Sequence, residues 1–274
     1  MRLKNISKEL ISFTLIFLLL FIGYSLAVTV NVKSVGKVTK LIGSAQIRKE
    51  DKGNWIVLKQ GMFVGVKDRI QVFKGAKLEL TFVDGTKLRM GGNTDLNIKQ
   101  YKHGSKDNPA KSFIKLNNGR IWAKLSKGKN KLGIQGKMAT CMVAGTCYRM
   151  ESDDESTVTT VYEGAVGIHL PFENVSEEEI STTLETFPQL KKEDKTSSPK
   201  PFTPPTVIEG PKEIPCPVKV VPGPREVSMN EWLQIVENQQ IVMKEGGKAF
   251  ISEIDLKKER QDEWIRWNEK LDKE

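Results

Sequence analysis

The stretch that decides the fold is RIQVFKGAKLELTFVDGTKLRMGGNTDLNIKQY, residues 69–101. Apolar and polar residues alternate along it, so that Leu78, Leu80 and Phe82 share one face of an extended chain. A period of two is typical of strands with one buried face. Between these runs lie Asp84-Gly85 and Gly91-Gly92-Asn93, whose residue types tolerate positive φ and favour tight turns. We therefore expect antiparallel strands joined by turns here, rather than a ligand-binding loop.

The same alternation continues outward through residues 35–170. Lys74-Gly75, Asn117-Asn118-Gly119 and Lys127-Gly128 have the residue types that hairpin turns require. About a dozen short strands at this spacing are typical of a sandwich, a barrel or a roll, and no helical periodicity interrupts them. We predict an all-β domain at residues 28–170, a roll or sandwich of short antiparallel strands.

The first 27 residues have the pattern of a secretory signal peptide. Arg2, Lys4 and Lys8 precede an almost wholly apolar run, and Ser25-Leu26-Ala27 fits the small-x-small cleavage rule. The alternative is an uncleaved membrane anchor, because the 17 residues of 11–27 lie near the lower limit for spanning a bilayer. Both interpretations place the remaining chain outside the cytoplasm, in the periplasm or beyond the cell.

The net charge of +9 is unevenly distributed. Residues 28–170 contain 25 Lys and Arg against 12 Asp and Glu, whereas the residues that follow are acidic overall. A basic surface attracts polyanions, which for an exported protein are cell-wall phosphates, anionic lipids or peptidoglycan carboxylates rather than nucleic acid. The alternative is a merely solvated surface, since outward-facing lysines also discourage aggregation of strand edges. The candidate binding residues are Lys115, Lys124, Lys127, Lys129, Lys131 and Lys137.

The composition changes after Leu170. Residues 171–226 combine an acidic patch with most of the prolines, which predicts a linker of extended backbone. Residues 227–274 are predicted to form a helical tail, with a first helix capped by Ser228 and Glu231 and a second running from about Asp255 to the end. Aromatic and apolar residues recur at helical spacing in this tail. An aromatic stripe of this kind docks on a protein's own core more often than on a partner, because exposed aromatic patches are costly. The candidate docking residues are Trp232, Ile235, Trp264 and Trp267.

Three cysteines, Cys141, Cys147 and Cys216, allow at most one bridge within the chain. Cys141 and Cys147 can join only if residues 144–146 turn the chain sharply, because along one straight strand they lie too far apart. No Cys-x-x-Cys pair or nearby His is present, so a metal site is not expected.

Catalytic and cofactor motifs are missing from the sequence. There is no nucleophile elbow, no His-Glu-x-x-His and no phosphate-binding loop, so neither an enzyme nor a cofactor is expected. Four Ser-x-x-Lys matches lack a companion Lys-Thr-Gly, and a Lys-rich chain produces such matches by chance. The two histidines, His103 and His169, have no positioned partner in the sequence.

The turn and core residues follow a fixed order: Gly36-x-Val38, Gly43, Trp55, Gly61, Asp68-Arg69-Ile70, Gly75-Ala76, Asp84-Gly85-Thr86, Asn93-Thr94, Asn118-Gly119, Gly145-Thr146 and Glu163-Gly164. In this order they make residues 35–170 resemble the FecR domain. The resemblance implies an extracytoplasmic β roll. In the best-known members this domain follows a cytoplasmic anti-sigma segment and a transmembrane helix, and it relays the ligand-loaded state of an outer-membrane receptor inward.

The sequence departs from the FecR pattern in three places. Only ten residues precede the apolar run, so we expect no cytoplasmic anti-sigma segment. Ala144 replaces the usual Arg before Gly-Thr, and Lys67-Asp68 replaces the usual Gly-Asp turn.

The leading hypothesis is a non-enzymatic exported envelope protein, a binding or scaffold module for a cell-wall polyanion or an envelope partner. The alternative is an extracytoplasmic sensing and regulatory protein that relays receptor occupancy through a separate membrane protein. A wall-processing enzyme would need a pocket with converging carboxylates or a Ser–Lys pair. Contact with the membrane is expected only through an uncleaved N-terminus.

Overall fold

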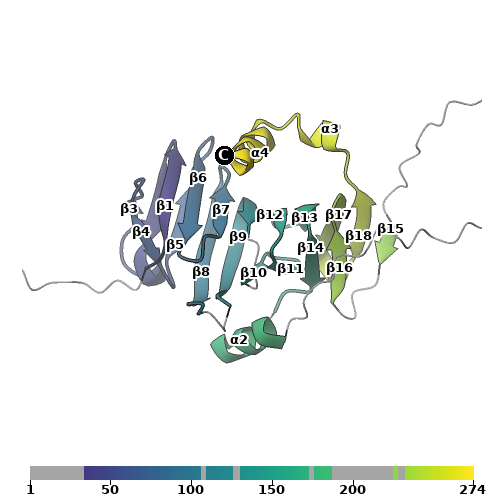
Figure 1. Ribbon diagram of the computed structural model, residues 1–274, viewed down its shortest axis with the longest axis horizontal. Helices are drawn as coiled ribbons and strands as arrows, with labels where there is room; N and C mark the ends of the chain where they lie inside the picture. Colours follow the sequence, from purple (N-terminus) through teal and green to yellow (C-terminus); the bar gives the residue numbers. More distant parts are fainter. Residues whose placement is uncertain (1–33, 106–108, 126–129, 173–175, 187–224, 228–231) are drawn as a thin grey trace, which may run out of the picture. The chain divides into compact units, whose positions relative to one another are not determined.

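The computed structural model describes residues 34–105, 109–125, 130–172, 176–186, 225–227 and 232–274 (Figure 1). The predicted signal peptide and most of the predicted linker, with its Cys216, lie outside the described residues. So do the Lys127-Gly128 turn and the predicted caps Ser228 and Glu231. The boundaries placed at residues 27 and 226 therefore stay predictions.

The strands form two sheets, which we call sheet A and sheet B. In sheet A the order of pairing is β4 (Phe63–Gly65), β1 (Ser34–Ile42), β6 (Lys77–Phe82), β7 (Lys87–Met90), the second half of β9 (Lys111–Lys124), β12 (Cys147–Ser152), β13 (Ser156–Glu163), β17 (Gln239–Lys244), β18 (Ala249–Glu253) and β15 (Arg225–Val227). In sheet B it is β3 (Ile56–Val57), β2 (Ala45–Arg48), β5 (Arg69–Val72), β8 (Thr94–Lys102), the first half of β9, β10 (Lys131–Gln135), β11 (Thr140–Ala144), β14 (Ala165–His169) and β16 (Leu233–Val236).

The inner faces of the two sheets share one hydrophobic core. Leu78 and Leu80 of β6 meet Ile70 of β5 and Ile114 of β9 there, all fully buried. This is the apolar face that the two-residue period of residues 69–101 predicts. The all-β roll or sandwich expected from the sequence is confirmed. Among the described residues, every strand pairing is antiparallel except the parallel contact of β9 with β10.

The turns in the fold-deciding stretch are also as predicted. Asp84-Gly85 joins β6 to β7, with Gly85 at φ +82°, and the Asp84 carboxylate accepts a hydrogen bond from the Thr86 amide at 3.0 Å. Gly92 lies where a Cβ would come within 2.7 Å of a backbone nitrogen, so only glycine fits this connection to β8.

The turn expected at Asn117-Asn118-Gly119 is wrong, because β9 runs through it without a break. The pairing register with β8 shifts between Leu116 and Asn118, which is a β-bulge. Gly119, at φ +98°, follows the bulge, and from it onward β9 pairs in sheet A instead of sheet B. The bulge therefore carries one strand from one sheet to the other.

The first helix predicted for the C-terminal tail is wrong where the structure describes it. Residues 233–236 form β16, which pairs with β14 and buries Ile235 completely. The strands β16, β17 and β18 thus lengthen both sheets. The second helix, predicted as one helix from about Asp255 to the end, occurs as two helices, α3 (Leu256–Glu259) and α4 (Glu263–Lys273), separated by residues 260–262. A further helix, α2 (Glu177–Thr186), occurs within the predicted linker.

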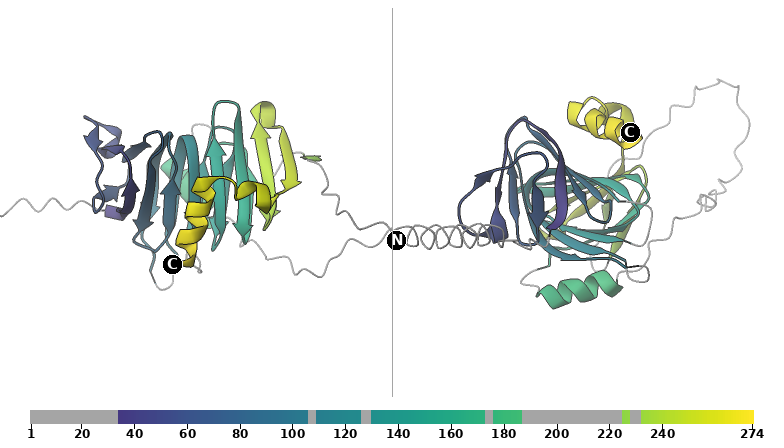
Figure 2. Two further views of the ribbon diagram at one scale, coloured as in Figure 1. Left: turned by 90° about the horizontal axis from the view of Figure 1, so that it is seen from above. Right: turned by 60° about the vertical axis from the view of Figure 1, so that its left-hand side comes forward.

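The helices cover the outer faces of the sandwich. Figure 2 shows α4 and α2 on opposite sides of the strands, with α4 beside sheet A and α2 beside sheet B. Two short 3-10 turns, η1 (Lys49–Asp51) and η2 (Glu245–Gly247), complete the described elements. Within the described ranges, no helix combines the length and the apolar character needed to cross a membrane.

Candidate functional site

A row of large side chains crosses the outer face of sheet A. Glu79, Arg89, Trp122 and Arg149 are successive register partners on β6, β7, β9 and β12, so their side chains project from the same face. The alternation of the strands assigns this face to solvent, yet Arg89 is 0% exposed because α4 lies over it. We call this covered surface the Arg89 face.

Arg89 is held from both below and above. Its Nε donates a hydrogen bond to the Glu79 carboxylate at 2.7 Å, and its Nη1 donates to the Asp272 carboxylate of α4 at 2.6 Å. Burial alone would raise the pKa of Glu79, but the hydrogen bonds from Arg89 and Thr39 outweigh this effect and lower that pKa. Glu79 is therefore a charged partner of the buried Arg89 guanidinium.

Asp272 is the point at which α4 makes most of its polar contacts with the Arg89 face. Besides the bond from Arg89, its carboxylate accepts one from the Trp122 indole at 3.0 Å, and its backbone carbonyl accepts one from Lys124 Nζ at 2.8 Å. The Cys147 Sγ lies 3.5 Å from the same carboxylate. Burial raises the pKa of the Cys147 thiol, and the negative charge of Asp272 raises it further.

Aromatic packing anchors the other end of α4. Trp264 is 1% exposed and meets Trp122 edge-on, with ring centroids 6.4 Å apart. Trp122 in turn stacks on Tyr162 at 4.4 Å, and the Arg120 guanidinium lies 4.6 Å from the centre of the Trp264 ring. The structure thus places Trp264 against the protein's own core, with Trp267 partly buried beside it.

Ion pairs surround this contact, each with the acidic residue on the C-terminal helices. The pairs are Lys40 with Glu274, Lys77 with Glu263, Arg120 with Asp262, and Arg149 with Glu259. Exposed pairs such as Lys40 with Glu274 contribute little, whereas Arg149 is nearly buried and its pair is screened less. The basic domain and the acidic tail inferred from the charge distribution therefore meet at the Arg89 face.

The other two predicted docking residues lie elsewhere. Ile235 is in the core between the sheets, and Trp232 packs with Phe172 and α2 on the outer face of sheet B. The His169 ring lies 4.9 Å from the Trp232 ring centre. The four predicted docking residues are therefore divided among three places rather than one face.

Cys141 and Cys147 do not form the bridge that the sequence allowed; both are free and buried. Residues 144–146 do turn the chain, but the turn leads from sheet B to sheet A. Cys141 points into the core between the sheets, where burial raises its pKa to about 12, while Cys147 points outward under α4. The two thiols therefore lie on different faces.

The predicted lysines do not gather into one patch. Lys115 is exposed on sheet B, whereas Lys124, on the same strand, lies in sheet A with Asp272, because β9 changes sheets between them. Lys137 pairs with Asp154 in a neighbouring turn, and Lys131 is partly buried at the start of β10. Lys127 and Lys129 lie outside the described residues.

Sequence reasoning missed Arg89, Trp122 and Asp272. Arg89 occupies an outward position in an alternating strand, which ordinarily means solvent, and Asp272 lies in a run of charged residues with no motif. In the part of the chain that the structure describes, no three His, Cys, Asp or Glu side chains form a group that could hold a metal ion.

Part of the chain matches a known protein family. Residues 68–167 match the family described as FecR protein, a region that begins at β5 and ends in β14. None of the curated proteins compared with the sequence matches it. Two crystal structures of a proposed anti-sigma factor from Parabacteroides distasonis are similar, each with 12% identity, a TM-score of 0.42, and coverage of 70% of this chain and 62% of that chain.

The present chain thus spans less than two thirds of the length of that protein. The strands β1 to β4, the C-terminal strands β15 to β18 and the helices α2 to α4 lie outside the matched region. The resemblance expected from the sequence is confirmed over residues 68–167, which match the FecR family.

Proposed function

We propose that this protein is an extracytoplasmic signal-regulatory protein of the bacterial envelope, which relays receptor occupancy through a separate membrane protein. The FecR domain supports a regulatory role over a catalytic one, and it favours the alternative hypothesis over wall binding. Within this role the Arg89 face is the partner-binding surface, and α4 is the element that covers it. The observation that carries the proposal is the set of unpaired polar atoms at this contact.

Four buried polar atoms of the Arg89 face and of α4 have no hydrogen-bond partner among the described residues. They are Arg89 Nη2, Arg149 Nε, Trp264 Nε1 and Asn268 Oδ1. A buried group without a partner costs about 1–3 kcal/mol, so α4 is bound less tightly than its buried surface alone would suggest. Arg89 keeps the Glu79 carboxylate when α4 leaves, so the face remains paired and folded. Trp264 Nε1 and Asn268 Oδ1 belong to α4 and become accessible to water when it leaves, so a partner that satisfies Arg89 Nη2 can replace α4.

The partner's chemistry follows from the helix that now occupies the face. A competing segment needs an acidic, amphipathic helix with a carboxylate for Arg89 and a large aromatic side chain for the Trp122 and Tyr162 surface. Receptor occupancy would then change which helix binds the Arg89 face, α4 or the partner's segment, by shifting the equilibrium between these two states. An element of 11 residues on the surface suits such exchange, because local opening costs less than global unfolding.

The cell-wall interpretation has weaker support. Lys40, Lys77 and Lys124 on sheet A are already paired with carboxylates of the C-terminal helices. A polyanion would have to displace those carboxylates first. Pelleting of the protein with purified sacculi across a salt series separates the two interpretations: binding that weakens as salt rises would restore the wall-binding hypothesis.

The direct test is an Asp272→Asn variant in the native cell, with transcription of the receptor-dependent genes as the readout. Because the substitution removes the charge that meets Arg89, it weakens the hold of α4 on the face, and we expect transcription that depends less on the receptor's ligand. Asp154→Asn is the matched control, since Asp154 pairs with Lys137 away from α4. A ligand response identical to wild type, in cells where α4 is shown to be released, would contradict the proposal.

A further inference from the structure

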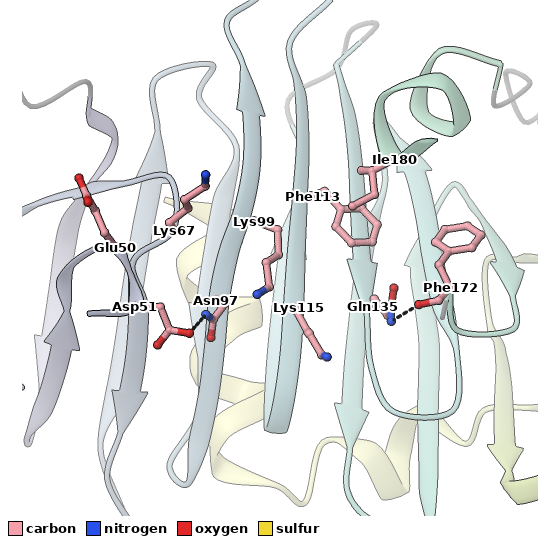
Figure 3. Close-up of a pocket in the computed structure, with 10 residues that line it drawn as sticks. All are labelled: Glu50, Asp51, Lys67, Asn97, Lys99, Phe113, Lys115, Gln135, Phe172 and Ile180. Carbon is pink, nitrogen blue, oxygen red and sulfur yellow. Dashed lines mark hydrogen bonds between the residues drawn. The ribbon is translucent and has the colours of Figure 1, made fainter. Parts of the chain in front are cut away.

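A cleft of about 450 Å³ lies on the outer face of sheet B, on the side of the sandwich away from α4. Figure 3 shows it between η1, which carries Glu50 and Asp51, and the start of α2. Its volume falls within the range of small-molecule sites in proteins, about 300–1,000 Å³. It shares no residue with the Arg89 face.

Lysines form the middle of the cleft. Lys99 comes from β8 and Lys115 from β9, and Asn97 and Lys115 are register partners on the same face. Neither lysine makes an ion pair or hydrogen bond with any other residue that the structure describes. Two ammonium groups without partners in a concave site raise the local concentration of anions.

The Asp51 carboxylate of the cleft is bound by other residues than these lysines. Asp51 is engaged by the Arg48 guanidinium and accepts a hydrogen bond from the Asn97 amide at 3.0 Å. The bond from Arg48 holds the pKa of Asp51 below its ordinary value. Glu50, at the end of the cleft away from Phe113 (Figure 3), disfavours a ligand with several negative charges. Lys67 lines the same end as Glu50 (Figure 3), so the three lysines and two carboxylates of the cleft leave one net positive charge, which fits a single anionic group.

The other end of the cleft is an apolar wall made by Phe113, Phe172 and Ile180 (Figure 3). Phe113 and Ile180 belong to the cluster that holds α2 on the sheet, and the rings of Phe113 and Phe172 lie 6.5 Å apart. A Cβ at Gly133 would come within 2.6 Å of the Phe113 ring, so glycine there makes room for it. Gln135 donates a hydrogen bond to the Phe172 carbonyl at 3.1 Å, which fixes the wall.

We propose that this cleft binds an amphipathic monoanion. Lys99 and Lys115 hold its carboxylate or phosphate group, and its apolar chain or ring packs on Phe113, Phe172 and Ile180. The anionic group could come from a free metabolite or from a lipid headgroup, and the chemistry is the same in both cases. The site is independent of the Arg89 face, so it stands or falls separately from the proposed function.

The test is calorimetric titration of the full chain with octyl phosphate, below its micellar concentration, at low salt and about pH 5, where the phosphate group carries mainly one negative charge. Inorganic phosphate carries the charge without the chain, and octyl glucoside carries the chain without the charge. We expect octyl phosphate to bind at least about 10-fold more tightly than either, since the site supplies both charged and apolar contacts. Equal binding of octyl glucoside, or no binding of octyl phosphate, would overturn the proposal.

Matched variants locate the binding. Lys99→Gln with Lys115→Gln should weaken octyl phosphate binding by about 10-fold, because two charge-assisted contacts are lost. Lys59→Gln with Lys74→Gln removes the same charge from exposed turns elsewhere and should leave the affinity unchanged. If both double variants behave alike, the cleft is not the site.

Vesicles of phosphatidylglycerol separate the two sources of ligand. Vesicle binding that depends on Lys99 and Lys115 assigns the site to a lipid headgroup, and octyl phosphate binding without vesicle binding assigns it to a free amphiphile. Both results support the proposal. Vesicle binding that survives the Lys99 and Lys115 substitutions, with no octyl phosphate binding, would refute it.

Discussion

Asp272→Asn should release α4 from the Arg89 face without unfolding the sandwich. The substitution removes the charge that meets Arg89 at 2.6 Å, while the asparagine oxygen can still accept the Trp122 indole hydrogen. Net contributions of hydrogen bonds to charged groups are about 1.5–3 kcal/mol. Because Arg89 keeps Glu79 as a partner, the loss should lie near the middle of that range, about 2 kcal/mol. This corresponds to about a 30-fold change in the equilibrium between docked and released helix.

Hydrogen exchange followed by mass spectrometry measures that equilibrium. Amides of α4 should exchange about 30-fold faster in the variant, while those of β6 and β7 keep their wild-type protection. Asp154→Asn is the control, because the Asp154 side chain is 89% exposed and its pair with Lys137 contributes little. Unchanged exchange in α4 would refute the assignment of Asp272 as its anchor. Equal acceleration in every strand would show that α4 is part of the global folding unit.

Three further outcomes test the structure. Gly119→Ala should destabilise the protein by about 3 kcal/mol in urea unfolding, because φ is +98° and the new Cβ would lie 2.5 Å from the backbone of Thr94. Gly53→Ala is the control: its φ is +71° but no atom lies near the new Cβ, so it should cost only about 1 kcal/mol. Cys141 and Cys147 should resist alkylation by iodoacetamide in the native protein. In a chain that ends before α3, Cys147 should become reactive and Cys141 should not, as peptide mass spectrometry would reveal; labelling of Cys141 in the shortened chain would contradict the assigned faces. The pKa of Glu79 is lowered in the folded protein, so this carboxylate stabilises the fold at pH values above 4.5, its ordinary pKa. This stability is lost as the pH falls through the folded pKa, so the melting temperature should drop over that pH range, and should drop less in Glu79→Gln.

Much of the fold could be predicted from local chemistry. The alternation of Leu78, Leu80 and Phe82 requires a strand with one buried face, and Asp84-Gly85 requires a tight turn, whatever the rest of the chain does. The ordered set of such turns was enough to predict the FecR domain that the family match confirms. These features depend on interactions within a few residues, which a sequence displays directly.

The candidate site could not be predicted in the same way. Outward positions in a strand, such as Arg89, are assigned to solvent unless another element covers them, and the covering residue Asp272 is remote in the sequence. Ile235 has the spacing of a helix, but the unpaired edge of β14 offers hydrogen bonds that draw it into a strand. A local preference for helix is overridden when strand pairing in the folded protein provides hydrogen bonds to the backbone groups.

The sequence by itself determined that residues 35–170 form paired strands, because side-chain alternation and glycine turns act locally. It also separated a basic domain from an acidic tail. Only the tertiary structure decided which charges meet. Lys115 and Lys124 lie on one strand, yet the bulge before Gly119 places them in different sheets, one open to the cleft and the other paired beneath α4. Burial of a charge depends on what packs over it, and that partner comes from a distant part of the chain.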